Sequence, residues 1–111
     1  MDDRIAAERF AALAHPTRLN IFRRLMQAGP EGMAAGLLAE ALSVAPNNLS
    51  AHLNTLSHAG LIQARREGRS RIYAVRIEAT GATVGFLVDE CCQGHPDVCG
   101  VVAPRMEPVG A

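Results

Sequence analysis

The chain has 111 residues, 49% of them hydrophobic and 20% charged, and its eleven arginines balance eleven acidic residues in the absence of any lysine. A chain of this length predicts one domain, and it contains no apolar run near the ~20 residues that span a bilayer. The acidic start, MDDRIAAERF, lacks the apolar segment of a signal peptide, so we expect a cytoplasmic protein without a membrane partner.

The N-terminal segment predicts an amphipathic helix. Residues 5–14 contain the alanine-rich stretch AAERFAALA, in which three apolar residues recur at helical spacing, namely Ala6, Phe10 and Leu13. The His-Pro pair at residues 15–16 ends this helix, because proline cannot continue it.

Two further helices are expected before the turn at residues 43–45. The first begins at Pro16, since proline is accepted in a first turn, and it stops at the Gly-Pro pair of residues 29–30. Its apolar side is expected to consist of Leu19, Phe22 and Met26. A shorter helix follows from about residue 33 to residue 42 and is largely apolar.

Residues 33–42 and 46–59, joined by a short turn, have the dimensions of a helix-turn-helix. In the second helix three leucines form a narrow apolar stripe, namely Leu49, Leu53 and Leu56. Apart from two histidines, the rest of that helix consists of small or amide-bearing residues without Lys, Arg, Asp or Glu. Asn can pair with adenine and Ser with either kind of base in a major groove, so we expect DNA contacts from Asn47, Asn48, Ser50 and Asn54.

His52 lies beside the leucine stripe and has two interpretations. It is either a further base or phosphate contact or a half-buried histidine that braces the helix. We count it among the DNA-binding candidates. An ordinary amphipathic surface helix is the competing interpretation of the whole segment, but such helices usually carry Lys and Glu, and this one carries neither.

After Gly60 the apolar period changes to that of strands. LIQARR and RIYAVRI predict two strands joined by EGRS, where Gly68 can take a positive φ. Residues 62–77 hold five arginines against one acid, Glu67. Arg69 and Arg71 are expected to reach phosphates or a narrow minor groove, and Arg65 is counted with them. A merely solvated hairpin would mix charge signs, so the basic hairpin favours DNA binding.

A last helix is expected from Ala79, with one apolar face formed by Val84, Leu87, Val88 and Cys91. Glycine and proline at residues 94 and 96 should end it. We therefore divide the chain into residues 1–92, a winged-helix DNA-binding and dimerisation domain, and residues 93–111, a cysteine-containing extension with a mobile tail. The expected fold class is mainly α (α+β), a winged helix-turn-helix with about five helices and a two-stranded hairpin.

Four stretches carry a resemblance to the ArsR/SmtB family of bacterial winged-helix repressors, and the resemblance covers residues 7–88. They are HPTR at residues 15–18, LSAHL at 49–53, AGL at 59–61 and the wing GRSRIY at 68–73. The resemblance implies a homodimer built through the first and last helices, with residues 46–59 as the recognition helix. It also implies repression of an operon from double-stranded operator DNA, relieved when an inducer binds.

The cysteines, all in the last fifth of the chain, bear on the inducer. The helix at 33–42 lacks the Cys-x-Cys site of one class of the family, and the last helix lacks the histidine of the zinc-binding class. A Cys-Cys pair at the end of the last helix, followed by Gly, Pro and a third Cys, resembles the arsenite-responsive branch. The resemblance implies As(III), or Sb(III), as inducer bound by Cys91, Cys92 and Cys99.

Thiolate chemistry supports the same site, because soft thiolates select soft ions and three sulfurs suffice for a trigonal ion. Cys99 could act within its own chain or across the dimer. One alternative is zinc, in a Cys3His site completed by His95, or another soft metal. The others are thiol oxidation resolved by Cys99 and no role for the thiols. The sequence places no base beside a cysteine nucleophile and has no phosphate-binding glycine loop, so we expect neither an enzyme nor an organic cofactor.

Overall fold

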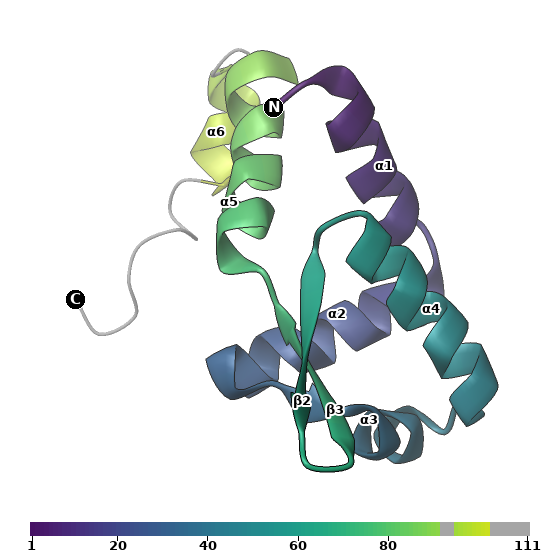
Figure 1. Cartoon of the computed structure of the whole chain (residues 1–111). Coiled ribbons are helices and arrows are strands. Elements are labelled where there is room, and N and C mark those ends of the chain that lie inside the picture. The colour runs from purple at the N-terminus through teal and green to yellow at the C-terminus, as the bar shows by residue number, and fades with distance from the viewer. Residues whose placement is uncertain (92–94, 103–111) are drawn as a thin grey trace.

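The computed structural model describes residues 1–91 and 95–102, which form a helical molecule with one small sheet (Figure 1). The α-helices in these residues are α1 (Asp3–Leu13), α2 (Pro16–Ala28), α3 (Ala35–Leu42), α4 (Pro46–His58), α5 (Ile77–Phe86) and α6 (Pro96–Val102). The strands are β1 (Met33–Ala34), β2 (Ile62–Glu67) and β3 (Ser70–Val75). A 3-10 turn, η1 (Gly29–Glu31), follows α2, and a π-helical turn, η2 (Leu87–Cys91), follows α5. The predicted α+β class is confirmed.

The sheet has three antiparallel strands in the order β1-β3-β2, one strand more than predicted. Met33 and Ala34 were expected to begin a helix, but they pair with Tyr73 and Ile72 of β3. Gly32, at a φ of 73°, turns the chain into β1, and a Cβ there would collide with the Tyr73 carbonyl. Pairing with a strand that lies 40 residues further along leaves no trace in local periodicity, so the prediction placed the start of α3 two residues too early.

The core forms where α2, α3, α4 and the sheet meet. Its fully buried side chains are Ile21, Leu25, Leu38, Leu49, Leu53, Leu56, Leu61 and Ile62. The predicted leucine stripe of α4 is therefore confirmed, and it seats α4 on the core along one face. Removing such a side chain from a packed core typically costs about 2–5 kcal/mol, so the placement of α4 is strongly determined.

The predicted apolar side of α2 is wrong at two of its three residues, whereas Phe22 packs partly buried against the core. Leu19 and Met26 are 45% and 43% exposed, whereas Ile21 and Leu25 are fully buried. Helix α2 contacts α1, α3, α4 and β3, so the face that it buries is chosen by several neighbours together. A helix with apolar residues on more than one side does not reveal that choice through its own spacing.

Arg9 of α1 joins the two halves of the fold. Its Nε donates to the carbonyl of Ala59, at the end of α4, at 3.1 Å. Its Nη1 donates to the carbonyl of Ala79 and to Oγ1 of Thr83, both in α5 and both at 3.2 Å. Thr83 is buried and its hydroxyl also donates to the Ala79 carbonyl. One guanidinium thus connects α1, α4 and α5.

The C-terminal region differs from the prediction in two ways. Helix α5 begins at Ile77, two residues earlier than expected. Pro96 begins α6 instead of ending the previous helix, which is consistent with the tolerance of helices for proline in their first turn. The predicted stop at residue 94 and the domain boundary at residue 92 fall outside the described residues. In the described part of the chain no helix is long and apolar enough to cross a bilayer.

Candidate nucleic-acid interface

Helices α3 and α4 form the predicted helix-turn-helix. Ser43 ends α3 in the left-handed conformation at a φ of 52°, and the short turn leads to Pro46 in the first turn of α4. Opposite the leucine stripe, four of the predicted reading residues are all exposed, namely Asn47, Asn48, Ser50 and Asn54. Helix α4 contains no Lys, Arg, Asp or Glu. Its outer face therefore offers neutral donors and acceptors, which is the chemistry of base recognition.

The β2–β3 hairpin forms the predicted wing, with Gly68 at a φ of 60° in its tight turn. The two-residue turn fixes the strand register, in which Arg66 lies directly opposite Arg71. Like charges directly opposite each other repel. In the described part of the chain, the side chains of Arg66, Arg69 and Arg71 make no hydrogen bond or ion pair. Three exposed guanidinium groups are thus available to an anionic partner.

Arg66 was missed in the analysis of the sequence. The signal that could have identified it is the turn itself, because a two-residue loop at Gly68 and Arg69 makes Arg66 the cross-strand partner of Arg71. Cross-strand partners share one face of a sheet. The two arginines therefore present their charges together.

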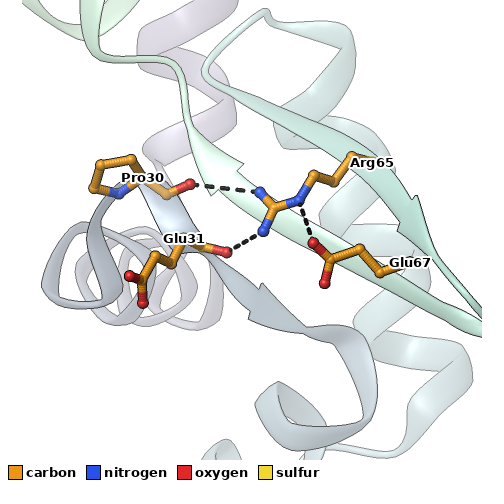
Figure 2. A network of polar contacts seen from close by, with 4 residues as sticks. All are labelled: Pro30, Glu31, Arg65 and Glu67. Atoms are coloured by element: carbon orange, nitrogen blue, oxygen red, sulfur yellow. Dashed lines mark hydrogen bonds and ion pairs between the residues drawn. The ribbon is translucent and has the colours of Figure 1, made fainter.

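Arg65 lies in β2, as Arg66 does, but its guanidinium makes hydrogen bonds within the chain (Figure 2). Its Nη2 donates to the Glu31 carbonyl at 2.6 Å, and its Nη1 donates to the Pro30 carbonyl at 3.4 Å. Its Nε donates to Oε1 of Glu67 at 3.1 Å. No finding tests the predicted DNA contact from Arg65. In this geometry its N–H groups hold the wing against the turn after α2.

His52 is half-buried and contacts side chains of the neighbouring α2 segment. Its ring lies against that of His15, and its Nδ1 is 3.3 Å from Nη1 of Arg18. Burial, and then the charges of His15 and Arg18, lower the pKa of His52 below its ordinary value. Of the two interpretations open at the outset, these contacts favour the bracing histidine.

The three cysteine thiols cannot be assembled from the described residues. Cys91 ends η2 and Cys99 lies within α6, but only their backbone is described, and Cys92 lies outside the described residues. In the described part of the chain no three His, Cys, Asp or Glu side chains are grouped to hold a metal. Nδ1 of His95 accepts from the Asp97 amide at 3.2 Å at the start of α6. The three-cysteine site stays a prediction.

Comparisons with known proteins give one consistent result. A helix-turn-helix domain family matches residues 13–63. The HTH-type transcriptional regulator YceK of Bacillus subtilis is 36% identical over 88 residues, which cover 78% of this chain and 86% of the relative. Two HTH-type transcriptional regulators from Mycobacterium tuberculosis strains are 35% identical over 72 residues, and the chain spans 61% of the length of those relatives.

Comparisons with solved structures give the same result as the sequence comparisons. An ArsR-like transcriptional regulator from Rhodococcus sp. RHA1 superposes with a TM-score of 0.72 at 25% identity, covering 96% of each chain. A homodimeric winged helix-turn-helix DNA-binding domain from Mycobacterium bovis gives a TM-score of 0.64 at 29% identity, covering 86% of this chain and 94% of that one. All of these relatives are described as regulators or DNA-binding domains, in agreement with the prediction that the chain is not an enzyme.

Proposed function

Since the chain belongs to the HTH-type transcriptional regulators and has the winged fold of their ArsR-like members, we propose that it is a homodimeric repressor released from its operator by trivalent arsenic. The observation that carries the DNA-binding part is the pairing of two exposed surfaces. One is the uncharged, amide-rich face of α4. The other is the wing, where the guanidinium groups of Arg66, Arg69 and Arg71 have no partner in the described part of the chain.

These surfaces have complementary tasks. Asn47, Asn48, Ser50 and Asn54 would read base edges in the major groove, where a bidentate amide–adenine pair is worth about 1–3 kcal/mol of discrimination. Arg69 and Arg71 would contact phosphates, which supplies affinity without sequence information. Two copies of α4 in a dimer would read half-sites about one DNA turn apart.

The exposed apolar residues support a dimer through the first and last helices. Helices α1 and α5 are in contact and stand side by side at the end of the molecule away from the hairpin tip (Figure 1). Both carry large apolar side chains that a single chain leaves exposed, including Ile5 of α1 and Val84 of α5. A second copy would cover them. The Mycobacterium bovis neighbour is a homodimer.

The proposal that trivalent arsenic is the inducer rests on the three cysteine thiolates as its ligands. Cys91, Cys92 and Cys99 supply three soft sulfurs within nine residues, and three thiolates fit a trigonal As(III) or Sb(III) without a fourth ligand. Cys91 ends η2, the π-helical turn that follows α5 directly, so binding there would act on a helix of the expected dimer. An inducer that weakens operator binding about 100-fold requires a coupling energy of about 2.7 kcal/mol.

The test is operator retardation with arsenite, antimonite, zinc, cadmium and peroxide compared side by side. We expect arsenite or antimonite to release the operator, and a Cys→Ser change at residue 91, 92 or 99 to abolish release while leaving operator affinity near that of the parent. His95→Ala should respond normally. Release by zinc that needs His95 would establish the Cys3His zinc alternative, and release by peroxide alone would establish thiol oxidation. Full arsenite response in the serine variants would refute the site.

A further inference from the structure

Two stretches far apart in the sequence, HPTR at residues 15–18 and LSAHL at residues 49–53, meet in one polar cluster. The rings of His15 and His52 are tilted by 48° with centroids 4.6 Å apart. Arg18 lies with Nη1 3.3 Å from Nδ1 of His52, and its Nε donates to the Ala12 carbonyl at 2.6 Å. One guanidinium therefore ties the end of α1 to the middle of α4.

The contacts define the protonation of the cluster. A guanidinium can donate but not accept, so Nδ1 of His52 accepts from Arg18, and the proton of the neutral ring is on Nε2. Nδ1 of His15 accepts from the Thr17 amide at 3.1 Å, which holds the His15 ring at the start of α2. A second proton on His52 would direct an N–H group at the guanidinium of Arg18. The observed arrangement therefore requires neutral His52.

We propose that Arg18 and His52 are positioning residues that fix the rotation of α4, and that sequence-selective DNA binding requires this cluster to be intact. The inference rests on the proposed function, in which α4 reads the operator. The leucine stripe determines which face of α4 is buried. The bond from Arg18 to His52 is directional, so it restricts the rotation of α4 that the apolar packing still allows.

Rotation matters because base readout has a narrow tolerance. Side chains reach about 5–6 Å from a helix axis, so a rotation of about 20° would move their ends by about 2 Å, well beyond the spread of hydrogen-bond lengths. Asn48 is one turn before His52, and both line an open hollow of about 440 Å³ that Thr17 and Ser43 also border. A shift of His52 would carry Asn48 with it.

The charges around the cluster make it sensitive to acid. His15 and Arg18 face His52 and both disfavour its protonation, while Thr17, Ser43 and Asn48 are neutral neighbours. Glu8 and His58 border a separate hollow with Arg18. Because burial and these charges lower the pKa of His52, its contribution is fully present above the ordinary value of 6.5 and is lost as the pH falls from there toward the folded-state pKa.

The experiment measures the Kd of a duplex that the full-length protein selects from a random pool, by fluorescence anisotropy from about pH 8 to about pH 5.5. His52→Gln removes the titrating ring, and His58→Gln, at an exposed position of the same helix, is the matched control. Acidification makes every variant more cationic and strengthens its binding to DNA in general. The readout is therefore the Kd of wild type divided by that of His52→Gln at each pH, with circular dichroism verifying the fold.

We expect this ratio to rise several-fold on acidification, no more steeply than about tenfold per pH unit because one proton is involved, and His58→Gln to follow wild type. Arg18→Lys should weaken binding about tenfold at about pH 8, since lysine cannot serve Ala12 and His52 at once. If Arg18 contacted a phosphate, the lysine variant would keep most of the affinity.

Three outcomes would overturn the inference. A ratio that falls on acidification would mean that protonated His52 contacts DNA. A ratio that is constant, or an Arg18→Lys variant with wild-type affinity, would mean that the cluster does not position α4. In each of these cases the proposed function survives. If wild type selects no duplex at about pH 8, the proposed function fails and the inference fails with it.

Discussion

Replacing Arg65 and Arg69 separately by alanine distinguishes an arginine that fastens the wing from one that contacts DNA. The two residues are in the same hairpin and carry the same charge. Arg65 donates to two backbone carbonyls and to Glu67, whereas Arg69, at the tip, makes no hydrogen bond or ion pair in the described part of the chain. A protein that binds DNA with a rigid wing should respond to the two changes in different ways.

The magnitudes follow from the two geometries. A hydrogen bond to a charged group contributes about 1.5–3 kcal/mol when it is buried. The Arg65 side chain is 44% exposed, so solvent screening reduces its three contacts to a total of about 1 kcal/mol. Arg65→Ala should therefore lower Tm by about 3–5 °C in a domain of this size. Arg69→Ala should leave Tm nearly unchanged, since an exposed change away from any contact stays within about 0.5 kcal/mol.

The DNA response should be the reverse. Each lost phosphate contact flattens the slope of log K against log salt by about 0.9. Over a fourfold range of salt, from about 50 to about 200 mM, the affinity deficit of Arg69→Ala should therefore shrink by about 3.5-fold. Arg65→Ala should weaken binding by a factor that does not change with salt. Differential scanning fluorimetry and anisotropy titrations measure both quantities. A slope flattened by about 0.9 in Arg65→Ala with unchanged Tm would refute the assignment of Arg65 to the wing anchor.

Three further predictions concern the reading face, the sheet and the dimer. Asn48→Ala should cost about 1–3 kcal/mol on the selected duplex and much less on random DNA; equal losses would indicate simple destabilisation. Gly32→Ala should lower the free energy of unfolding by more than about 1 kcal/mol, because its φ of 73° is strained for alanine and the Cβ would meet the Tyr73 carbonyl. Gly36→Ala is the control, because it has open space around it. It should be neutral or stabilising by up to about 1 kcal/mol. Val84→Glu should shift sedimentation toward monomer, while Leu37→Glu, at an even more exposed apolar position on α3, should not. A dimer in both variants would exclude α5 from the interface.

The parts of the fold that the sequence predicted are those with local causes. The leucine spacing in α4 identified its buried face, and Gly68 identified the wing turn, because helical period and turn chemistry act over a few residues. The exposed positions of Asn47, Asn48, Ser50 and Asn54 followed from the same spacing.

The features that the sequence did not predict depend on distant partners. Strand β1 exists because β3 lies beside it, and the buried side of α2 is set by four neighbouring elements. Arg65 is held by backbone carbonyls, which every residue has and which therefore leave no signal in a sequence. The meeting of His15 with His52 is likewise a tertiary contact. The role of the cysteines remains a prediction from thiolate chemistry and resemblance.

Arg9 limits how this regulator can be divided or recombined. The helix-turn-helix family match begins at residue 13, yet removal of α1 would take the shared donor away from the Ala59 and Ala79 carbonyls and from buried Thr83. The reading unit is therefore not an independent module that begins at α2. A chimera that exchanges C-terminal segments between such proteins should keep α1 and α5 from the same parent and join the foreign segment after Phe86. A junction before Thr83 would separate Arg9 from one of its partners and weaken its link between α5 and the end of α4.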